Sequence, residues 1–210
     1  MQPFAPDERA VIASAISRAE DNTSGEIVVV VAPASSTYRY FSLMCVAMLA
    51  LAVPLPFIHL TKWPVEYIYI AQLLVFAAGG LLMQWQPLRV AITPKSLKRA
   101  RAHQRAVEQF LVQNLHTTKG RTGVLIYVSD AERYAEVIAD DGIYQKVSPQ
   151  VWDDVIAALT AHLGKATRTE GFVAAIELCG KVLAEHFPPG TYDADELPNH
   201  LIVLDAAEPA

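Results

Sequence analysis

Three acidic residues and one arginine carry the clearest chemistry in this sequence. Glu26 opens one apolar run, and Arg121 directly precedes a second. Asp140 and Asp141 directly follow a third. Carboxylates grouped together hold a divalent cation such as calcium or magnesium, or polarise a water for phosphoester hydrolysis while an arginine steadies the phosphate oxygens. The competing interpretation, which we favour, is a surface salt-bridge cluster with Asp141-Gly142 as a turn.

These four residues meet only if the apolar runs form one sheet. Residues 26–31 and 122–128 are continuous, largely β-branched runs, typical of strands that are covered on both faces. A helical pattern from Pro94 to about Leu115 precedes the second run, so the two strands are expected to be parallel neighbours. The third run, residues 134–139, follows after five residues, which permits only an antiparallel hairpin. The pairing brings Glu26, Arg121, Asp140 and Asp141 to one edge of the sheet.

Further helices are predicted at residues 7–21, from Pro149 to Gly164, and from a cap at Thr169 to about Phe187. Ser148 is expected to cap the middle one. The inner face of the helix after Pro94 is expected to take His103, Ala106, Val107, Phe110 and Leu111. The acidic tail from Thr191 is expected to be extended or disordered, or docked through Leu201–Leu204. The predicted fold is a three-layer α/β/α Rossmann-like sandwich on a mixed β-sheet.

An apolar block interrupts this fold after its first strand. It consists of two segments, at about 41–60 and 65–86, and the only charged residues between Phe41 and Trp85 are Lys62 in the connecting loop and Glu66. At about 1.5 Å per residue, each crosses a hydrocarbon layer of about 30 Å. We therefore predict a transmembrane hairpin, in preference to a helical hairpin buried in a soluble core. Pro54 and Pro56 predict a kink, or an end of the first helix near Val53. The resulting parts are residues 1–37, 38–90, 91–187 and the tail 188–210.

The flanks of the block predict its orientation and its interface residues. Positive charge gathers before the first segment and after the second, against Lys62 alone in the connecting loop, which places both termini in the cytoplasm. Aromatic residues lie near both expected interfaces. The predicted membrane-interface residues are Arg39, Trp63, Trp85, Arg89, Lys95, Lys98, Arg99 and Arg101.

Composition and missing motifs exclude several classes of protein. The net charge of −5 removes the electrostatic support that nucleic-acid binding needs. Two cysteines, Cys45 and Cys179, give neither a disulfide framework nor a cysteine zinc site. The opposite end of the predicted sheet offers Ser35, Ser129 and Glu132, but Ser129 lies outside a G-x-S-x-G elbow. No residue is assigned as catalytic.

Five motifs occur in the order that is typical of one family. They are TSGEIVVVV at 23–31, HQRAVEQF at 103–110, RTGVLIYVSDAER at 121–133, EVIADDGI at 136–143 and VWDDVI at 151–156. Over about residues 5–187 the chain resembles the TPM domain family, in particular its bacterial membrane-anchored members with a hairpin inside the domain. The resemblance implies a Rossmann-like sandwich beside a membrane. The family includes a thylakoid lumenal protein for which acid phosphatase activity and calcium binding are reported, and it has no agreed catalytic mechanism.

One departure from the family pattern bears on its function. Many secreted members read Asp-Asn-Gly where this chain has Arg121-Thr122-Gly123, so a cation replaces a carboxylate. We therefore predict an interaction or assembly module at the cytoplasmic face of the bacterial inner membrane. Its expected partners are the lipid bilayer and another membrane protein or a second copy, and no cofactor is required. The alternative is a metal-assisted phosphatase using Glu26, Asp140 and Asp141.

Overall fold

The chain folds into two compact units, which are described separately. The computed structural model describes residues 4–163, 167–190, 197 and 199–205. The first unit, called the sheet unit, takes in the described residues up to Ser35 and from Arg101 onward. The second, called the hairpin unit, is formed by Ser36–Ala100. The boundary at residues 100 and 101 falls inside one helix, α6 (Lys95–Val112).

The sheet unit is built on a mixed four-stranded sheet in the order β3-β2-β1-β4. Strand β1 (Glu26–Ala32) pairs in parallel with β2 (Gly123–Ser129), and β2 pairs antiparallel with β3 (Tyr134–Ala139). These three strands and their directions confirm the predictions from the sequence. Strand β4 (Leu201–Val203) pairs in parallel with the other edge of β1, so Leu201–Leu204 docks the tail. The structure of most of residues 191–200 lies outside the described residues.

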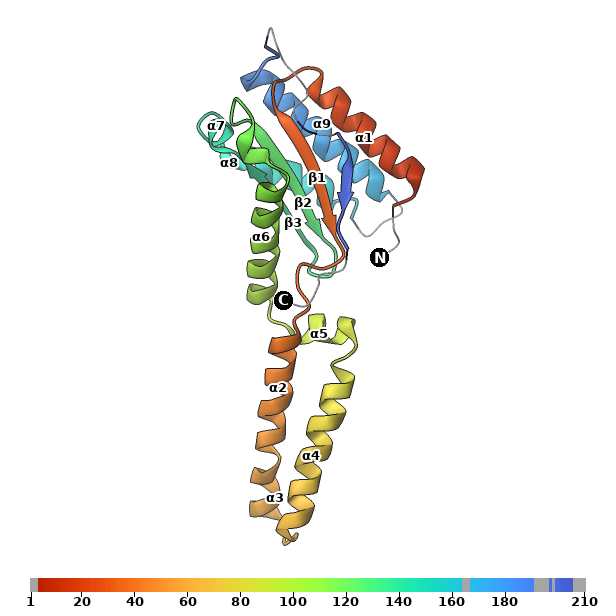
Figure 1. Ribbon diagram of the computed structural model, residues 1–210, viewed down its shortest axis with the longest axis vertical. Helices are drawn as coiled ribbons and strands as arrows, with labels where there is room; N and C mark the ends of the chain where they lie inside the picture. The colour runs from red at the N-terminus through yellow and green to blue at the C-terminus, as the bar shows by residue number, and fades with distance from the viewer. Residues whose placement is uncertain (1–3, 164–166, 191–196, 198, 206–210) are drawn as a thin grey trace. The chain divides into compact units, whose positions relative to one another are not determined.

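Helices cover both faces of this sheet (Figure 1). On one face lie α1 (Pro6–Glu20), α8 (Pro149–Thr160) and α9 (Arg168–His186), which enclose the larger core with the alternate strand residues Val29 and Ile126. On the other face lie α6 and a short 3₁₀ helix, η1 (Leu115–Thr117), against Val30 and Tyr127. The strands read as unbroken apolar runs because both of their faces are buried.

Several predicted details of the helices are wrong. On α6 the predicted inner residues Ala106 and Phe110 are buried, whereas Val107 and Leu111 are 37% and 51% exposed, because the buried face runs through Ala102. His103 is exposed as well, with Nδ1 at 2.8 Å from Oε1 of Glu136 on β3. Thr169 does not cap α9, whose first residue is Arg168, and its hydroxyl donates to Glu8 on α1 at 3.1 Å. Ser148 occupies the N-cap position of α8, but its side chain makes no capping hydrogen bond. The predicted stop at Gly164 lies outside the described residues.

The predicted turn at Asp141-Gly142 is instead a short helix, α7 (Asp141–Tyr144). Asp140 is its N-cap, and Oδ1 of this side chain accepts a hydrogen bond from the backbone N–H of Asp141 at 2.7 Å. An N-cap aspartate satisfies one of the backbone donors that the first turn of a helix leaves without partners. The chain therefore leaves β3 through a capped helical turn that fixes the direction of both carboxylates.

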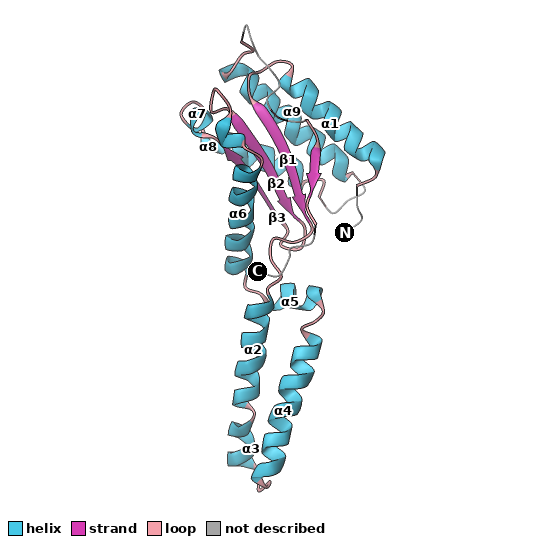
Figure 2. Ribbon diagram, viewed as in Figure 1, coloured by secondary structure: helices cyan, strands magenta, loops and turns pink. Residues whose placement is uncertain are grey.

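The hairpin unit consists of two long apolar helical segments and a short helix (Figure 2). Helix α2 (Arg39–Ala52) continues through Val53 into α3 (Pro54–Leu60), and α4 (Val65–Leu82) runs back beside them. The interruption at Val53 confirms the predicted effect of the two prolines. Gly79 allows the close approach of α4 to α2, since a Cβ there would lie 2.8 Å from Val46. The second segment ends at Leu82 rather than near 86, because Gln86 opens the separate helix α5 (Gln86–Ile92).

Candidate functional site

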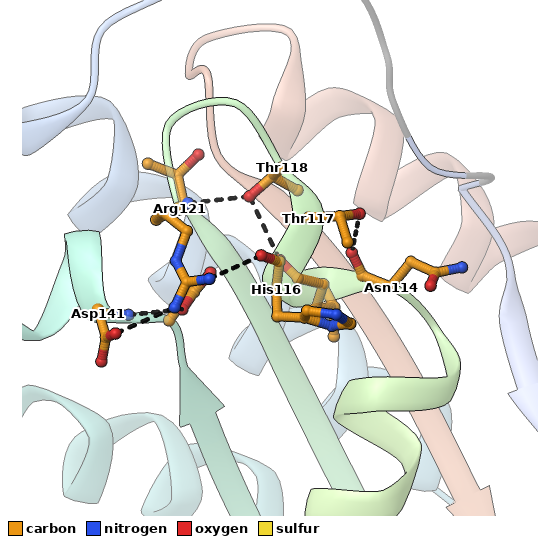
Figure 3. A network of polar contacts seen from close by, with 9 residues as sticks. Asn114, His116, Thr117, Thr118, Arg121 and Asp141 are labelled. Carbon is orange, nitrogen blue, oxygen red and sulfur yellow. Dashed lines mark hydrogen bonds and ion pairs between the residues drawn. The ribbon is translucent and has the colours of Figure 1, made fainter.

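Arg121 and the two aspartates that follow β3 form one ion-pair cluster. Nη2 of Arg121 lies 3.0 Å from Oδ1 of Asp140 and 3.0 Å from Oδ2 of Asp141. Nη1 of the same guanidinium donates to the backbone carbonyl of His116 in η1 at 2.9 Å. Figure 3 shows the side chain of Arg121 reaching between this carbonyl and the Asp141 carboxylate. Three separate segments are thus joined by one cation.

Local backbone geometry holds this cluster in place. Arg121 adopts φ 54°, in the left-handed region, and its N–H donates to the carbonyl of Thr118 at 3.0 Å. Gly142 packs directly against this turn, because a Cβ on it would lie 2.6 Å from the carbonyl oxygens of both Gly120 and Arg121. A side chain at position 142 would therefore push α7 away from Arg121.

Burial divides the two aspartates into different roles. The Asp140 side chain is 4% exposed, and its Oδ2 is buried without a hydrogen-bond partner among the described residues. The Asp141 side chain is largely exposed. Glu26 is also buried, and it lies opposite Gly123 in the register of β1 and β2, one strand away from Asp140. Within the part of the chain that the structure describes, no three His, Cys, Asp or Glu side chains are grouped to hold a metal ion.

A second polar network lies at the carboxyl ends of β1 and β2. Ser35 Oγ lies 2.8 Å from the Tyr127 hydroxyl and 2.7 Å from Ser129 Oγ, to which it donates. Ser129 Oγ in turn donates to Oε2 of Glu132, and Oε1 of Glu132 accepts from the Ser35 N–H at 3.1 Å. Because each hydroxyl carries a single proton, the donors run in one direction, from Tyr127 through Ser35 and Ser129 to the carboxylate.

This network is closed to substrates in the structure. Tyr127 and Ser129 are fully buried, and Ser35 is nearly so. Burial raises the pKa of the Tyr127 phenol, an effect that its hydrogen bonds to Ser35 and Ser129 partly oppose. The phenol therefore stays protonated and serves as the first donor, while Ser129 has neither the access nor the adjacent histidine of an activated nucleophile. Sequence reasoning found Ser35, Ser129 and Glu132 at this end but missed Tyr127, which is one aromatic residue in an apolar strand.

Arg168, like Tyr127, makes contacts that were not predicted from the sequence. Its guanidinium stacks over the ring of Phe4, 4.3 Å from the centroid, and pairs with Oδ1 of Asp130 at 3.2 Å. Burial raises the pKa of the Asp130 carboxyl, and the charge of Arg168 partly opposes the shift. Burial likewise lowers the pKa of Arg168, opposed by Asp130. This ion pair joins α9 to the loop after β2. The two residues are 38 positions apart in the sequence, so no local pattern predicts their contact.

The structure distributes the predicted interface residues over both ends of the hairpin unit and the start of α6. Arg39 is the first residue of α2, and Trp85 is the exposed N-cap of α5. Trp63 lies between α3 and α4, with its ring 5.1 Å from that of Phe57. Arg89 on α5 is buried. The remaining four predicted residues lie on α6 and are Lys95, Lys98, Arg99 and Arg101.

Comparison with known proteins supports the resemblance over part of the chain. Residues 86–182 match the family model of the TPM domain. No curated protein matches the chain. The NMR structure of the BA42 protein from the psychrophilic bacterium Bizionia argentinensis has a similar fold, with a TM-score of 0.60 and 23% identity over 96% of each chain. At this identity the likeness concerns the fold alone.

Proposed function

We propose that this protein is a membrane-anchored interaction or assembly module at the cytoplasmic face of the bacterial inner membrane. The observation that carries the proposal is the exposure of the two apolar segments. Residues 39–60 and 65–82 are long and apolar enough to cross a membrane, and 17% and 6% of their most apolar windows are buried. A helical hairpin in a soluble core would be mostly buried, whereas lipid covers such surface in a membrane protein.

The charges at the two ends of the hairpin support the orientation. Arg39 begins the first segment and Arg89 follows the second, and four further cations follow within the first two turns of α6. The opposite end carries Lys62 alone among lysines and arginines. An excess of positive charge marks the cytoplasmic side of a bacterial inner-membrane protein. Both termini are accordingly proposed to lie in the cytoplasm.

The proposal of an interaction role is supported by the polar side chains at both ends of the sheet, which bond mainly to each other. At one end of the sheet, Arg121 pairs with one carboxylate oxygen of Asp140 and one of Asp141. At the other end, hydrogen bonds run from Tyr127 through Ser35 and Ser129 to Glu132. Buried polar networks of this kind make the surrounding core rigid, and neither one contains a nucleophile beside a general base. They resemble structural ties more than a catalytic constellation.

An apolar strip on α6 is the proposed contact surface for another membrane protein or a second copy. Val107 and Leu111 lie one helical turn apart and are both exposed, and Val112 adjoins them. Their exposure contradicts the expectation of a buried stripe and gives the sheet unit an apolar surface without a partner in the chain's described part. Apolar side chains grouped on one helix face favour protein contacts.

A metal-assisted phosphatase is the second candidate, and one observation favours it. Oδ2 of Asp140 is buried without a partner among the described residues, and buried acceptors in native proteins usually have a partner such as water or an ion. Against it stands Arg121, whose positive charge already occupies the space between the two carboxylates and repels a divalent cation. The acidic cluster therefore ranks below the interaction role.

Membrane anchoring is tested first, because the other statements depend on it. Membranes from cells that produce the full chain are washed with alkaline carbonate, and reporter fusions are placed after Ala210 and in the loop 61–64. We expect the protein to stay in the membrane pellet, with a cytoplasmic reporter active at Ala210 and an exported reporter active in the loop. Release into the wash, or the reverse pattern of reporters, contradicts the proposal.

The interaction role and the phosphatase role are then separated in detergent. Crosslinking in the native membrane is compared for the wild type and a Val107→Ser, Leu111→Ser variant, with Val11→Ser on α1 as the matched exposed control. Loss of a crosslinked species in the double variant alone supports the α6 surface. Phosphoester hydrolysis with calcium, magnesium or manganese that disappears in Asp140→Asn would establish the phosphatase instead.

A further inference from the structure

The hairpin unit contains a polar hollow at the end where α2 begins and α4 finishes. Its volume is about 220 Å³, and it is lined by Arg39, Ser42, Leu43, Gly80, Met83, Gln84 and Arg89. All of these residues belong to the hairpin unit. Helix α5 packs against α2 at this end of the hairpin (Figure 2). A hollow of this size is below the usual range of about 300–1,000 Å³ for drug-sized ligands, so its occupant is a small group.

Arg89 is the unusual member of this lining. Its residue is 8% exposed, and Nε is buried without a hydrogen-bond partner among the described residues. Its backbone is well anchored, because the carbonyl accepts from the Thr93 hydroxyl at 2.7 Å and the N–H donates to Trp85. A buried guanidinium N–H that lacks a partner is costly, since arginines are seldom buried without a counter-charge.

A second cation stands beside it. The pKa of Arg89 is lowered by its burial and also by the positive charge of Arg39. The ion pairs between described residues include no acidic partner for either arginine, and the hollow has no aspartate or glutamate in its lining. Two positive charges are thus held near each other at the end of the hairpin where α2 begins and α4 ends. The repulsion between these two positive charges is unfavourable, and an anion bound between them would offset it.

We propose that this hollow binds a phosphate group through the guanidiniums of Arg39 and Arg89. Arginine matches phosphate because its planar fork donates two parallel hydrogen bonds to two oxygens of the anion. The amide of Gln84 supplies a neutral donor in the same lining. The site goes beyond the interaction role, and only the lipid source of its phosphate rests on the proposed membrane anchoring.

Both possible sources of phosphate share this chemistry. The hollow lies where the apolar segments end, which is the level of the headgroups if the hairpin crosses a bilayer, and basic pockets between helices at that level bind anionic lipid headgroups. A soluble phosphate would reach the same two arginines from the aqueous side. Gly80 keeps the space open, because a Cβ at this position meets no atom within 4 Å.

The test uses the full chain in dodecyl maltoside micelles with two probes. Inorganic phosphate is titrated by calorimetry. Dioleoyl phosphatidylglycerol is added to the micelles and counted by native mass spectrometry, with dioleoylglycerol, which has the same tails and no phosphate, as the lipid control. The variants are Arg39→Gln, Arg89→Gln and Gly80→Leu, and the matched control is Arg99→Gln, an exposed arginine of α6 outside the hollow.

We expect each of the three site variants to weaken binding at least tenfold, with less than a twofold effect of Arg99→Gln. Binding of both probes, or of either one alone, supports the site and identifies the source of the phosphate. Absence of binding by both probes, or unchanged binding in Arg39→Gln and Gly80→Leu, overturns the proposal. These two variants decide the matter if Arg89→Gln fails to fold, because Arg39 is exposed and Gly80 faces open space. Binding in micelles and retention in alkaline-washed membranes are independent measurements, so failure of one is distinguished from failure of the other.

Discussion

Nη2 of Arg121 lies 3.0 Å from Oδ1 of Asp140, and the two side chains differ sharply in exposure, at 48% and 4%. The arginine therefore reaches from solvent to neutralise a buried carboxylate, in the position that a bound cation would take. A chain that supplies its own cation at this point does not need a metal there for stability. This relationship is the reason that we propose a structural role for the acidic cluster rather than a metal centre.

Replacing Arg121 tests this tie. Arg121→Gln leaves the buried Asp140 carboxylate without its charge partner, so we expect a loss of about 1–3 kcal/mol in the free energy of unfolding. The measurement is urea unfolding in detergent, followed by tryptophan fluorescence in a Trp63→Phe, Trp85→Phe background, where the signal comes from Trp152 in the sheet unit. Arg105→Gln, which breaks the more exposed pair with Glu108, is the matched control and should cost about 0–1 kcal/mol. Equal effects of the two variants would show that Asp140 does not depend on Arg121.

The packing of Gly142 against the Arg121 turn predicts a steric effect. A methyl group in Gly142→Ala would meet two carbonyl oxygens at 2.6 Å, and backbone atoms yield less readily than the end of a side chain. We expect a destabilisation of about 1–3 kcal/mol. Gly190→Ala is the control, because its Cβ meets no atom within 4 Å, and its effect should stay within about 0.5 kcal/mol. Thermal unfolding of both variants in parallel gives the comparison, and a neutral Gly142→Ala would refute the close packing.

The hydroxyl chain at the other end of the sheet predicts an ordered series of losses. Ser129→Ala removes the acceptor for Ser35 and a donor to Glu132, so we expect about 1–3 kcal/mol. Tyr127→Phe removes only the first donor and should cost about 0.5–1.5 kcal/mol. Ser14→Ala on the exposed face of α1 serves as the control. Loss of an esterase activity with unchanged stability in Ser129→Ala would point to a catalytic serine and contradict the structural role.

Cys179 predicts a dependence of stability on pH. Complete burial raises the pKa of its thiol from 9.0 to about 12, so the thiol ionises more readily in the unfolded chain than in the folded one. Stability from this group is therefore fully present below pH 9.0 and is lost as the pH rises toward 12. Between pH 8 and pH 10, the wild type should lose about 1.4 kcal/mol more than Cys179→Ala. Parallel pH profiles of the two proteins, measured by urea unfolding, would contradict a buried neutral thiol.

The parts of the fold that the sequence predicted correctly are those with a strong local pattern. Strands β1, β2 and β3 were predicted from their apolar runs. The lengths of their connections predicted whether each pair is parallel or antiparallel. The break at Val53 follows from the geometry of proline in the same way. These features depend on residues that are close together in the chain, so the pattern contains the information.

The parts that were missed depend on distant contacts. The face that α6 presents is set by the sheet it packs on, and the buried Ala106 and the exposed Val107 are adjacent positions about 100° apart around the helix. The docking of β4, which the sequence left open beside an extended or disordered tail, depends on the free edge of β1. Helix α5 was missed because it is short and has no apolar pattern of its own. In the candidate site, the meeting of Arg121 with Asp140 and Asp141 was predicted from the pairing of the strands, whereas Tyr127 and Arg168 were found only in the structure.

The insertion of the hairpin between β1 and β2 also imposes an order on folding during synthesis. Val29 leaves the ribosome long before its partner Ile126, and the whole helical hairpin emerges in between. At about 5–20 residues per second, β1 waits roughly 5–20 s for the strand beside it. During that interval a strongly apolar, β-branched segment has helix α1 beside it but no neighbouring strand, so we expect residues 26–32 of the nascent chain to need shielding until translation has passed Ser129.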